Sequence, residues 1–176
     1  MNSSMKTDDS GDKSEFVANL NVFRQIEFFS GVSIEVMKLF AFLCQRQFYQ
    51  KGDFIFRQDD DDGCSYYILS GKVKLVLNAG GKEHSIREYG AESYFGALSL
   101  VTPMVKQFSL IAIQDTVCMV MSRKAFSKVV DQFPDIHVTI ARSIGKRLLQ
   151  AERKCIHEFE LKERDELKNL LGISLI

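Results

Sequence analysis

The sequence predicts a mainly β domain, either a sandwich or a barrel, with helices before and after it in the chain. Between residues 45 and 123, short β-rich segments alternate with glycine-containing turns. On both sides of this region apolar residues recur at helical spacing. The chain has 176 residues, of which 45% are hydrophobic, so it is long enough and apolar enough for one folded domain.

The chain divides into four predicted segments. Residues 1–15 contain only two apolar side chains and are predicted to be a disordered tail. Residues 16–133 are the predicted domain, which opens with two helices, the second capped by Ser33. Residues 134–171 are predicted to form one long helix, and residues 172–176 a short tail.

The central region is predicted to consist of short strands joined by tight turns. Gly80 and Gly81 lie between two such strands and indicate the tip of a hairpin. A short helix that includes Phe126 and Val129 follows, and Pro134 is predicted to lie in the first turn of the long helix. The predicted strands include residues 54–56, 66–69, 73–77, 85–86, 110–113 and 117–121.

The predicted long helix carries an apolar stripe. A helix over residues 135–171 would span about 55 Å, which is more than the width of a small domain. We therefore expect the helix to project from the domain and its stripe to pack against a second copy, making a homodimer, or against another protein partner. The stripe consists of Ile136, Ile140, Ile144, Leu148, Ala151, Cys155 and Phe159.

Charge and hydropathy argue against several classes of partner. The chain has 23 basic and 23 acidic residues, a balance that argues against nucleic acid or an anionic membrane as the main partner. No apolar run is long enough to span a membrane, and the N-terminus lacks the apolar core of a secretory signal. The four cysteines form no CxxC pair, so we expect reduced cysteines and a cytoplasmic protein.

No catalytic or metal-binding set is visible in the sequence. His84, His137 and His157 are scattered, and no nucleophile–base motif is present, so the chain is predicted not to be an enzyme. Four consecutive aspartates, residues 59–62, invite a calcium-loop hypothesis. The first and last loop positions would then be Gln58 and Leu69, which are not carboxylates. The aspartates are therefore predicted to form a solvated turn, with no metal site.

The segment around Gly96 is the most informative for function. A predicted strand ends at Tyr94-Phe95, Gly96 follows, and Ala97-Leu98-Ser99-Leu100 can form one turn of helix. The free N–H groups at such a helix start can hold an anion. Lys106 is the next basic residue and is expected to face the same anion, with no acid opposing it.

In this context the sequence resembles the cyclic nucleotide-binding domain family, which includes catabolite activator proteins and regulatory subunits of cyclic-nucleotide-dependent kinases. The matching features are Lys51-Gly52-Asp53, the stretch from Gly63 to Lys74 and the stretch from Tyr89 to Leu100. The resemblance implies an eight-stranded, jelly-roll-like β-roll with flanking helices. It also implies that a ligand such as cAMP or cGMP lies against the turn at residues 96–100 and that a C-terminal helix responds to it. The implied ligand-binding residues are Gly96, Ala97, Leu98, Ser99, Lys106 and Gln107.

Two positions depart from the family pattern. The family has a glutamate for the ribose 2′-hydroxyl where this chain has Ala97, and an arginine for the cyclic phosphate where it has Lys106. Lysine keeps the charge but lacks the planar fork that can pair two phosphate oxygens. Gln107 and Phe108 are also larger than the family's usual small residues and could crowd the phosphate.

These departures predict a non-enzymatic regulatory module that acts by self-association or partner docking, with weakened binding of cAMP and cGMP. One alternative is a genuine cyclic nucleotide sensor in which Gln107 replaces part of the lost contacts. A second alternative is the sensor part of a transcription regulator. Since only five residues follow the predicted helix, we expect no DNA binding by this chain alone.

Overall fold

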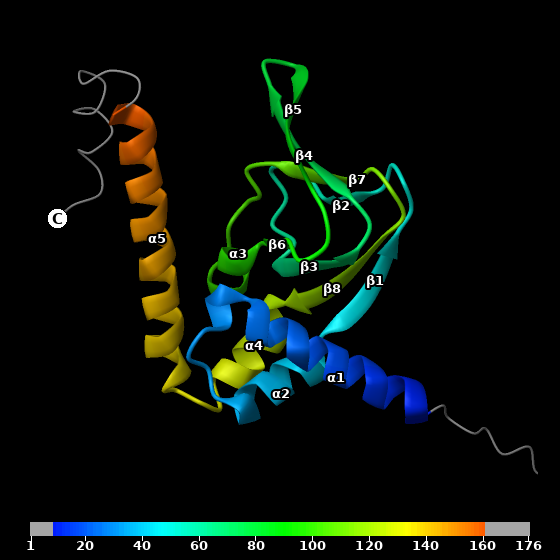
Figure 1. Cartoon of the computed structure of the whole chain (residues 1–176), viewed down its shortest axis with the longest axis vertical. Helices are drawn as coiled ribbons and strands as arrows, with labels where there is room; N and C mark the ends of the chain where they lie inside the picture. The colour runs from blue at the N-terminus through cyan, green and yellow to red at the C-terminus, as the bar shows by residue number, and fades with distance from the viewer. Residues whose placement is uncertain (1–8, 161–176) are drawn as a thin grey trace, which may run out of the picture.

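A computed structural model describes the backbone of residues 9–160 and the side chains of residues 14–156 (Figure 1). Helix α1 (Asp9–Gln25) begins seven residues before the predicted start, so the disordered tail predicted over residues 9–15 is wrong. Acidic residues are favourable in the first turn of a helix. In addition, Glu15 Oε1 lies 3.5 Å from Arg46 Nε, which ties this polar turn to the domain. Residues 1–8 of the predicted tail lie outside the described part, as do residues 161–176.

The helices around the N-terminus build a phenylalanine-rich core. A 3₁₀ turn, η1 (Glu27–Phe29), and helix α2 (Ile34–Leu43) follow α1. Ser33 occupies the N-cap position of α2 as predicted, although its side chain makes no capping hydrogen bond. Phe40 stacks on the ring of Phe126 at 5.5 Å between centroids and on that of Phe23 at 5.9 Å. This cluster fixes the helices against one end of the β region.

Within the described residues, eight strands form two antiparallel sheets in a jelly-roll-like arrangement. One sheet has the order β1 (Gln45–Tyr49), β8 (Thr116–Ser122), β3 (Cys64–Ser70), β6 (Tyr94–Phe95). The other has the order β2 (Phe54–Phe56), β7 (Ser109–Ala112), β4 (Val73–Ala79), β5 (Lys82–Tyr89). Buried side chains of both sheets, among them Ile68, Val73, Leu110 and Cys118, form a second core.

The hairpin predicted at the two glycines is present. β4 and β5 pair through Ala79 and Lys82, and the two-residue tip has positive φ at Gly80 (59°) and Gly81 (73°). Both residues with φ > 0 are typical of a type I′ turn, which glycine adopts without steric cost. Strand β1 was not among the predicted strands, because four of its five side chains are exposed and three of those are polar.

Three further helices complete the domain. Helix α3 (Ala97–Val101) follows β6, and helix α4 (Arg123–Val130) begins where Ser122 Oγ accepts the Ala125 N–H at 3.2 Å. Helix α5 (Ile136–Glu160) runs beside the domain (Figure 1). Pro134 lies two residues before α5, in the preceding turn, and not in its first turn as predicted.

The four cysteines are free thiols, as the sequence predicts. Cys155 on α5 is exposed, whereas Cys44 and Cys118 are buried packing residues. No helix within the described residues is both long and apolar enough to cross a membrane.

Candidate functional site

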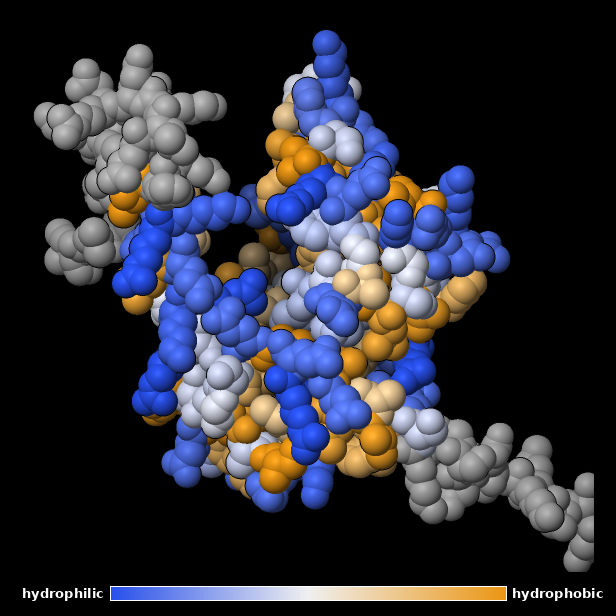
Figure 2. All heavy atoms as spheres, viewed as in Figure 1, coloured by the Kyte–Doolittle hydropathy of each residue, from blue (hydrophilic) through white to orange (hydrophobic). Residues whose placement is uncertain are grey.

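A cavity of about 640 Å³ lies between the β sheets, α3 and α5. Figure 2 shows an opening between the long helix and the rest of the molecule, with hydrophilic side chains at its rim and hydrophobic ones deeper inside. The volume is in the range of roughly 300–1,000 Å³ that is common for small-molecule sites. This cavity is the candidate ligand site.

The structure brings all six predicted ligand-binding residues to the wall of this cavity. Phe108, which was expected to crowd a phosphate, also lines it. The residues come from α3 and from the loop between α3 and β7, two segments that are adjacent in the sequence. They are Gly96, Ala97, Leu98, Ser99, Lys106 and Gln107.

Gly96 has a steric reason to be glycine. Its φ is +78°, and a Cβ placed there would lie 2.5 Å from the carbonyl oxygen of Cys64 and 3.1 Å from Nζ of Lys106. A Cβ at such distances would require the neighbouring β3 backbone to move. Gly96 therefore allows α3 to begin directly against β3, at the edge of the cavity.

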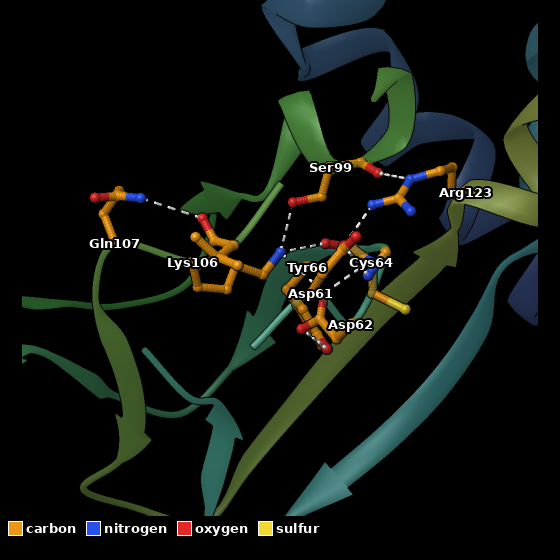
Figure 3. A network of polar contacts seen from close by, with 10 residues as sticks. Asp61, Asp62, Cys64, Tyr66, Ser99, Lys106, Gln107 and Arg123 are labelled. Atoms are coloured by element: carbon orange, nitrogen blue, oxygen red, sulfur yellow. Dashed lines mark hydrogen bonds and ion pairs between the residues drawn. The ribbon is translucent and has the colours of Figure 1, made fainter. Parts of the chain in front are cut away.

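Lys106 is buried and fully engaged within the protein (Figure 3). Its Nζ lies 2.7 Å from Ser99 Oγ, 2.9 Å from the Cys64 carbonyl oxygen and 3.0 Å from Asp62 Oδ1. Only 5% of its side chain is exposed. The expectation that no acid opposes this cation is therefore wrong: Asp62 neutralises it.

The acidic turn at residues 59–62 is exposed, as the sequence predicts, but the Asp62 carboxylate is also bonded within the protein. The Asp62 carboxylate accepts the Tyr66 hydroxyl at 2.9 Å and the Cys64 N–H at 2.8 Å, in addition to pairing with Lys106. Burial, and then the nearby Asp62 carboxylate, raises the pKa of Tyr66, so its phenol stays protonated and donates. The turn thus places the Asp62 carboxylate against the Lys106 ammonium of the cavity wall.

A second aspartate of the same turn joins the network. The Arg123 guanidinium pairs with the Asp61 carboxylate, and this hydrogen bond lowers the pKa of Asp61 below its usual value of 3.8. Arg123 Nε also donates to the Ser99 carbonyl at 2.6 Å. Ser99 is therefore held from both sides, because its hydroxyl contacts Lys106 and its carbonyl contacts Arg123 (Figure 3).

The apolar stripe of α5 is divided between three environments. Ile136 and Ile140 are buried in the protein's own helical core, so the structure removes them from the predicted dimer interface. Ile144 and Leu148 line the cavity. Ala151 and Cys155 lie farther along and are exposed, while the side chain of Phe159 lies outside the described residues. An apolar helix stripe can pack on its own domain first, and the sequence does not show where that contact ends.

Arg147 is a cavity residue that the sequence analysis missed. It lies between Ile144 and Leu148 on α5 and lines the same cavity. Within the part of the chain that the structure describes, its side chain makes no ion pair or hydrogen bond. Its position three residues after Ile144 and next to Leu148 was the available signal, since residues i and i+3 share a helix face.

Arg147 also borders a second, more polar cavity of about 400 Å³. Glu27 and Gln150 line this space, and Gln150 Nε2 donates to Glu27 Oε1 at 3.2 Å. This contact connects α5 to η1. Arg147 therefore lies between an apolar cavity on one side and a polar one on the other.

The described residues contain no cluster of three His, Cys, Asp or Glu side chains that could hold a metal ion. Among the described residues, the features that can act on a ligand are the mainly apolar walls of the larger cavity, the Tyr94 hydroxyl, Lys106 with its paired charge, and Arg147, which makes no ion pair.

Comparison with known proteins places residues 46–133 under the family model described as cyclic nucleotide-binding domain. The chain is 28% identical over 149 residues to the cyclic AMP receptor protein of Thermus thermophilus, which covers 84% of this chain and 67% of that protein. It is 30% identical over 98 residues to lysophospholipase nte1 of Aspergillus fumigatus, covering 55% of this chain but 6% of that enzyme. The enzyme match is confined to this domain, and the relationship is to a non-enzymatic regulatory domain, as the sequence predicts.

Solved structures show the same fold. A cyclic nucleotide-binding domain from Methylobacillus flagellatus superposes with a TM-score of 0.68 at 21% identity, covering 89% of this chain and 88% of that chain. The predicted β-roll with flanking helices is thereby confirmed.

Proposed function

This chain belongs to the cyclic nucleotide-binding domain family, and on that premise we propose that it is a regulatory sensor whose cavity binds a small molecule other than cAMP or cGMP. Binding of these two nucleotides is proposed to be weak. The module passes the state of the cavity to α5, which lines it through Ile144, Arg147 and Leu148. A cytoplasmic location stays a prediction of the sequence.

This proposal rests on the observation that the charge of Lys106 is already paired with a carboxylate of the protein itself. The family resemblance assigns this residue to the cyclic phosphate, but its charge is paired with Asp62 at 3.0 Å and its remaining donors are used by Ser99 and Cys64. A phosphate would bring its negative charge close to that of Asp62. The ligand would therefore gain little from Lys106 unless Asp62 moved away.

Ala97 weakens nucleotide recognition further. It lines the cavity at the position where the family has the glutamate that binds the ribose, and it has no side-chain acceptor. A hydrogen bond to a charged group contributes roughly 1.5–3 kcal/mol, which corresponds to about one to two decades of affinity. The loss of this bond adds to the loss of the phosphate contact.

Calorimetric titration of the whole chain with cAMP and cGMP tests the proposal. We expect dissociation constants above roughly 100 µM for both, a binding free energy weaker than about 5.5 kcal/mol. A 2′-deoxy form of cAMP should bind as weakly as cAMP itself, since Ala97 cannot read the hydroxyl. Low-micromolar binding with clear discrimination against the 2′-deoxy form would instead establish the alternative, a genuine cyclic nucleotide sensor with a modified site.

We also propose that the module acts by self-association through the distal part of α5. Ala151 and Cys155 are exposed, and Leu149 and Ile156 are 52% and 37% exposed. Exposed apolar residues on a helix that extends along the side of its domain can be covered by a second copy, and burial at roughly 25 cal/mol per Å² favours such association.

A further inference from the structure

The chemistry of the cavity walls points to a ligand class. We propose that the cavity takes an apolar carboxylate: a molecule with a hydrophobic body and one anionic group, which Arg147 binds. This inference rests on the proposed function, because it takes the same cavity as the sensor site and names what fills it.

Most of the cavity wall is apolar or aromatic. It includes Phe28, Phe56, Phe95 and Met104, together with Leu148 from α5. Such a surface favours a hydrophobic body over a sugar, most of whose hydroxyl groups would lose water against apolar side chains. Figure 2 agrees, since the depth of the opening is hydrophobic.

The polar side chains on the described wall define where a charge can be held. They are Ser99, Lys106, Gln107, Arg147 and the two tyrosines Tyr89 and Tyr94, and no acidic side chain is among the described wall residues. The tyrosine hydroxyls are neutral and cannot balance the charge of an anion. The Ser99 hydroxyl and the Lys106 ammonium are already bonded to each other at 2.7 Å. The Gln107 amide is bonded to the Val105 carbonyl at 3.4 Å and carries no charge.

Arg147 is the cation of this wall that makes no ion pair among the described residues, although Glu27 and Glu92 line the polar cavity on its other side. In contrast to Lys106, it has no carboxylate within ion-pair distance among the described residues. A guanidinium can bind a carboxylate through two parallel hydrogen bonds, which supplies both affinity and orientation. One free cation beside an apolar space matches one anionic group on an apolar body.

The position of Arg147 also separates this site from the family's phosphate site. Arg147 belongs to α5, whereas the family resemblance assigns the anion to the α3 turn and Lys106. A ligand held by Arg147 would contact the sheets with its body and α5 with its charge. Ligand binding would therefore favour the position of α5 seen here, close against the domain.

Displacement of a fluorescent probe tests this ligand class on the whole chain. The probe is 1-anilinonaphthalene-8-sulfonate, an aromatic molecule with one anionic group, and the competitors are decanoate and decanol, which differ mainly in charge. For wild type we expect decanoate to displace the probe at a concentration roughly ten-fold lower than decanol, because only decanoate can form charge-assisted hydrogen bonds with the Arg147 guanidinium. The variant Arg147→Gln should lose this preference.

Lys146→Gln is the matched control, since it removes a positive charge from the next residue of α5 without altering the described cavity wall. It should keep the preference for decanoate. Equal displacement by decanoate and decanol in wild type would overturn the proposal, as would absence of probe fluorescence or equal effects of the two variants. Tight binding of cAMP in calorimetry would refute the proposed function instead. The competition experiment measures the contribution of Arg147 to carboxylate binding, whatever the result with cAMP.

Discussion

Asp62 decides the electrostatics of the cavity, although it lies outside the cavity wall. Its carboxylate has three donors around it: the Lys106 ammonium, the Tyr66 hydroxyl and the Cys64 N–H. Lys106 is buried while the Asp62 side chain is 24% exposed, so removing Asp62 leaves the Lys106 charge without a counter-ion in a poorly solvated place. Asp62 is therefore a structural counter-ion as well as a competitor of any anionic ligand for Lys106.

The first expected outcome concerns Asp62→Ala. We expect this variant to lower the free energy of unfolding by roughly 1.5–3 kcal/mol, because Lys106 is 5% exposed and loses its counter-ion but keeps its bonds to Ser99 and Cys64. Asp60→Ala is the control, since the Asp60 side chain is exposed and belongs to the same turn, and it should cost less than about 0.5 kcal/mol. Urea denaturation measures both. Equal stabilities of the two variants would show that the ion pair does not form in solution.

The second expected outcome concerns the pH dependence of stability in wild type and in Asp61→Asn. The Arg123 hydrogen bond lowers the Asp61 pKa in the folded protein, so this carboxylate stabilises the fold above its unfolded pKa of about 3.8. Stability is lost as the pH falls through the lower, folded pKa. The difference in unfolding free energy between wild type and Asp61→Asn should therefore be constant near neutral pH and disappear in acid.

Denaturation series at several pH values would show this convergence. Asp60→Asn should differ little from wild type throughout. A difference for Asp61→Asn that persisted unchanged at the most acid pH would mean that the Asp61 carboxylate does not contribute through its charge.

Among the elements, α3 depends on the close approach of its first turn to β3. Gly96 and Gly81 have similar positive φ values, 78° and 73°, but a Cβ on Gly81 meets nothing within 4 Å. Gly81→Ala should therefore cost about 1–2 kcal/mol for the left-handed backbone alone. Gly96→Ala should cost roughly 1–3 kcal/mol more, because the Cys64 carbonyl must also shift. Thermal or urea unfolding that gave equal losses would contradict this account of α3.

The sequence was sufficient to predict elements whose pattern is local. Alternating apolar residues with Gly80-Gly81 between them predicted the hairpin, and the spacing of Ile136 and Ile140 predicted α5. Strand β1 was missed because its exposed, polar side chains lack that alternation. The start of α1 was missed because its first turns are polar and gain their support from a distant residue, Arg46.

The candidate site was predictable only in part. The family resemblance grouped Gly96 to Ser99 with Lys106 and Gln107, and all of them line one cavity. The pairing of Asp62 with Lys106 joins residues of different loops, and nothing in the local pattern of four aspartates indicates which of them turns inward. Arg147 was missed for a related reason, since the side of α5 that faces the cavity depends on how the helix packs.

For the molecule as a whole, the exposed distal part of α5 leads to an expected assembly. Light scattering should show a dimer at micromolar concentration, and Ala151→Lys with Cys155→Lys, two positions on one face of α5, should give a monomer, because two charges would have to be buried in the interface. Val138→Lys is the control on the same helix, at a residue that is 62% exposed near the domain end, and should leave the dimer intact.

Oxidative cross-linking through Cys155 is an independent test of the same dimer. Cys155 is exposed on α5, and in a parallel helix pair it would lie beside its counterpart. Mild oxidation should then produce a covalent dimer that Cys155→Ser abolishes. A monomer at high micromolar concentration, with no cross-link through Cys155, would rule out self-association through this face.

The pairing of Lys106 with Asp62 is tested most directly by comparing the cAMP affinity of wild type with that of Asp62→Asn. Asparagine keeps one acceptor oxygen, which can serve the Cys64 N–H, and its NH2 group can donate to the Tyr66 oxygen, but it leaves the Lys106 charge available to a phosphate. Calorimetry should give a dissociation constant above roughly 100 µM for wild type and a value about ten-fold lower for Asp62→Asn, with Asp60→Asn unchanged. Low-micromolar binding of cAMP by wild type would contradict the conclusion that Asp62 already pairs with Lys106. So would an affinity of Asp62→Asn no higher than that of Asp60→Asn.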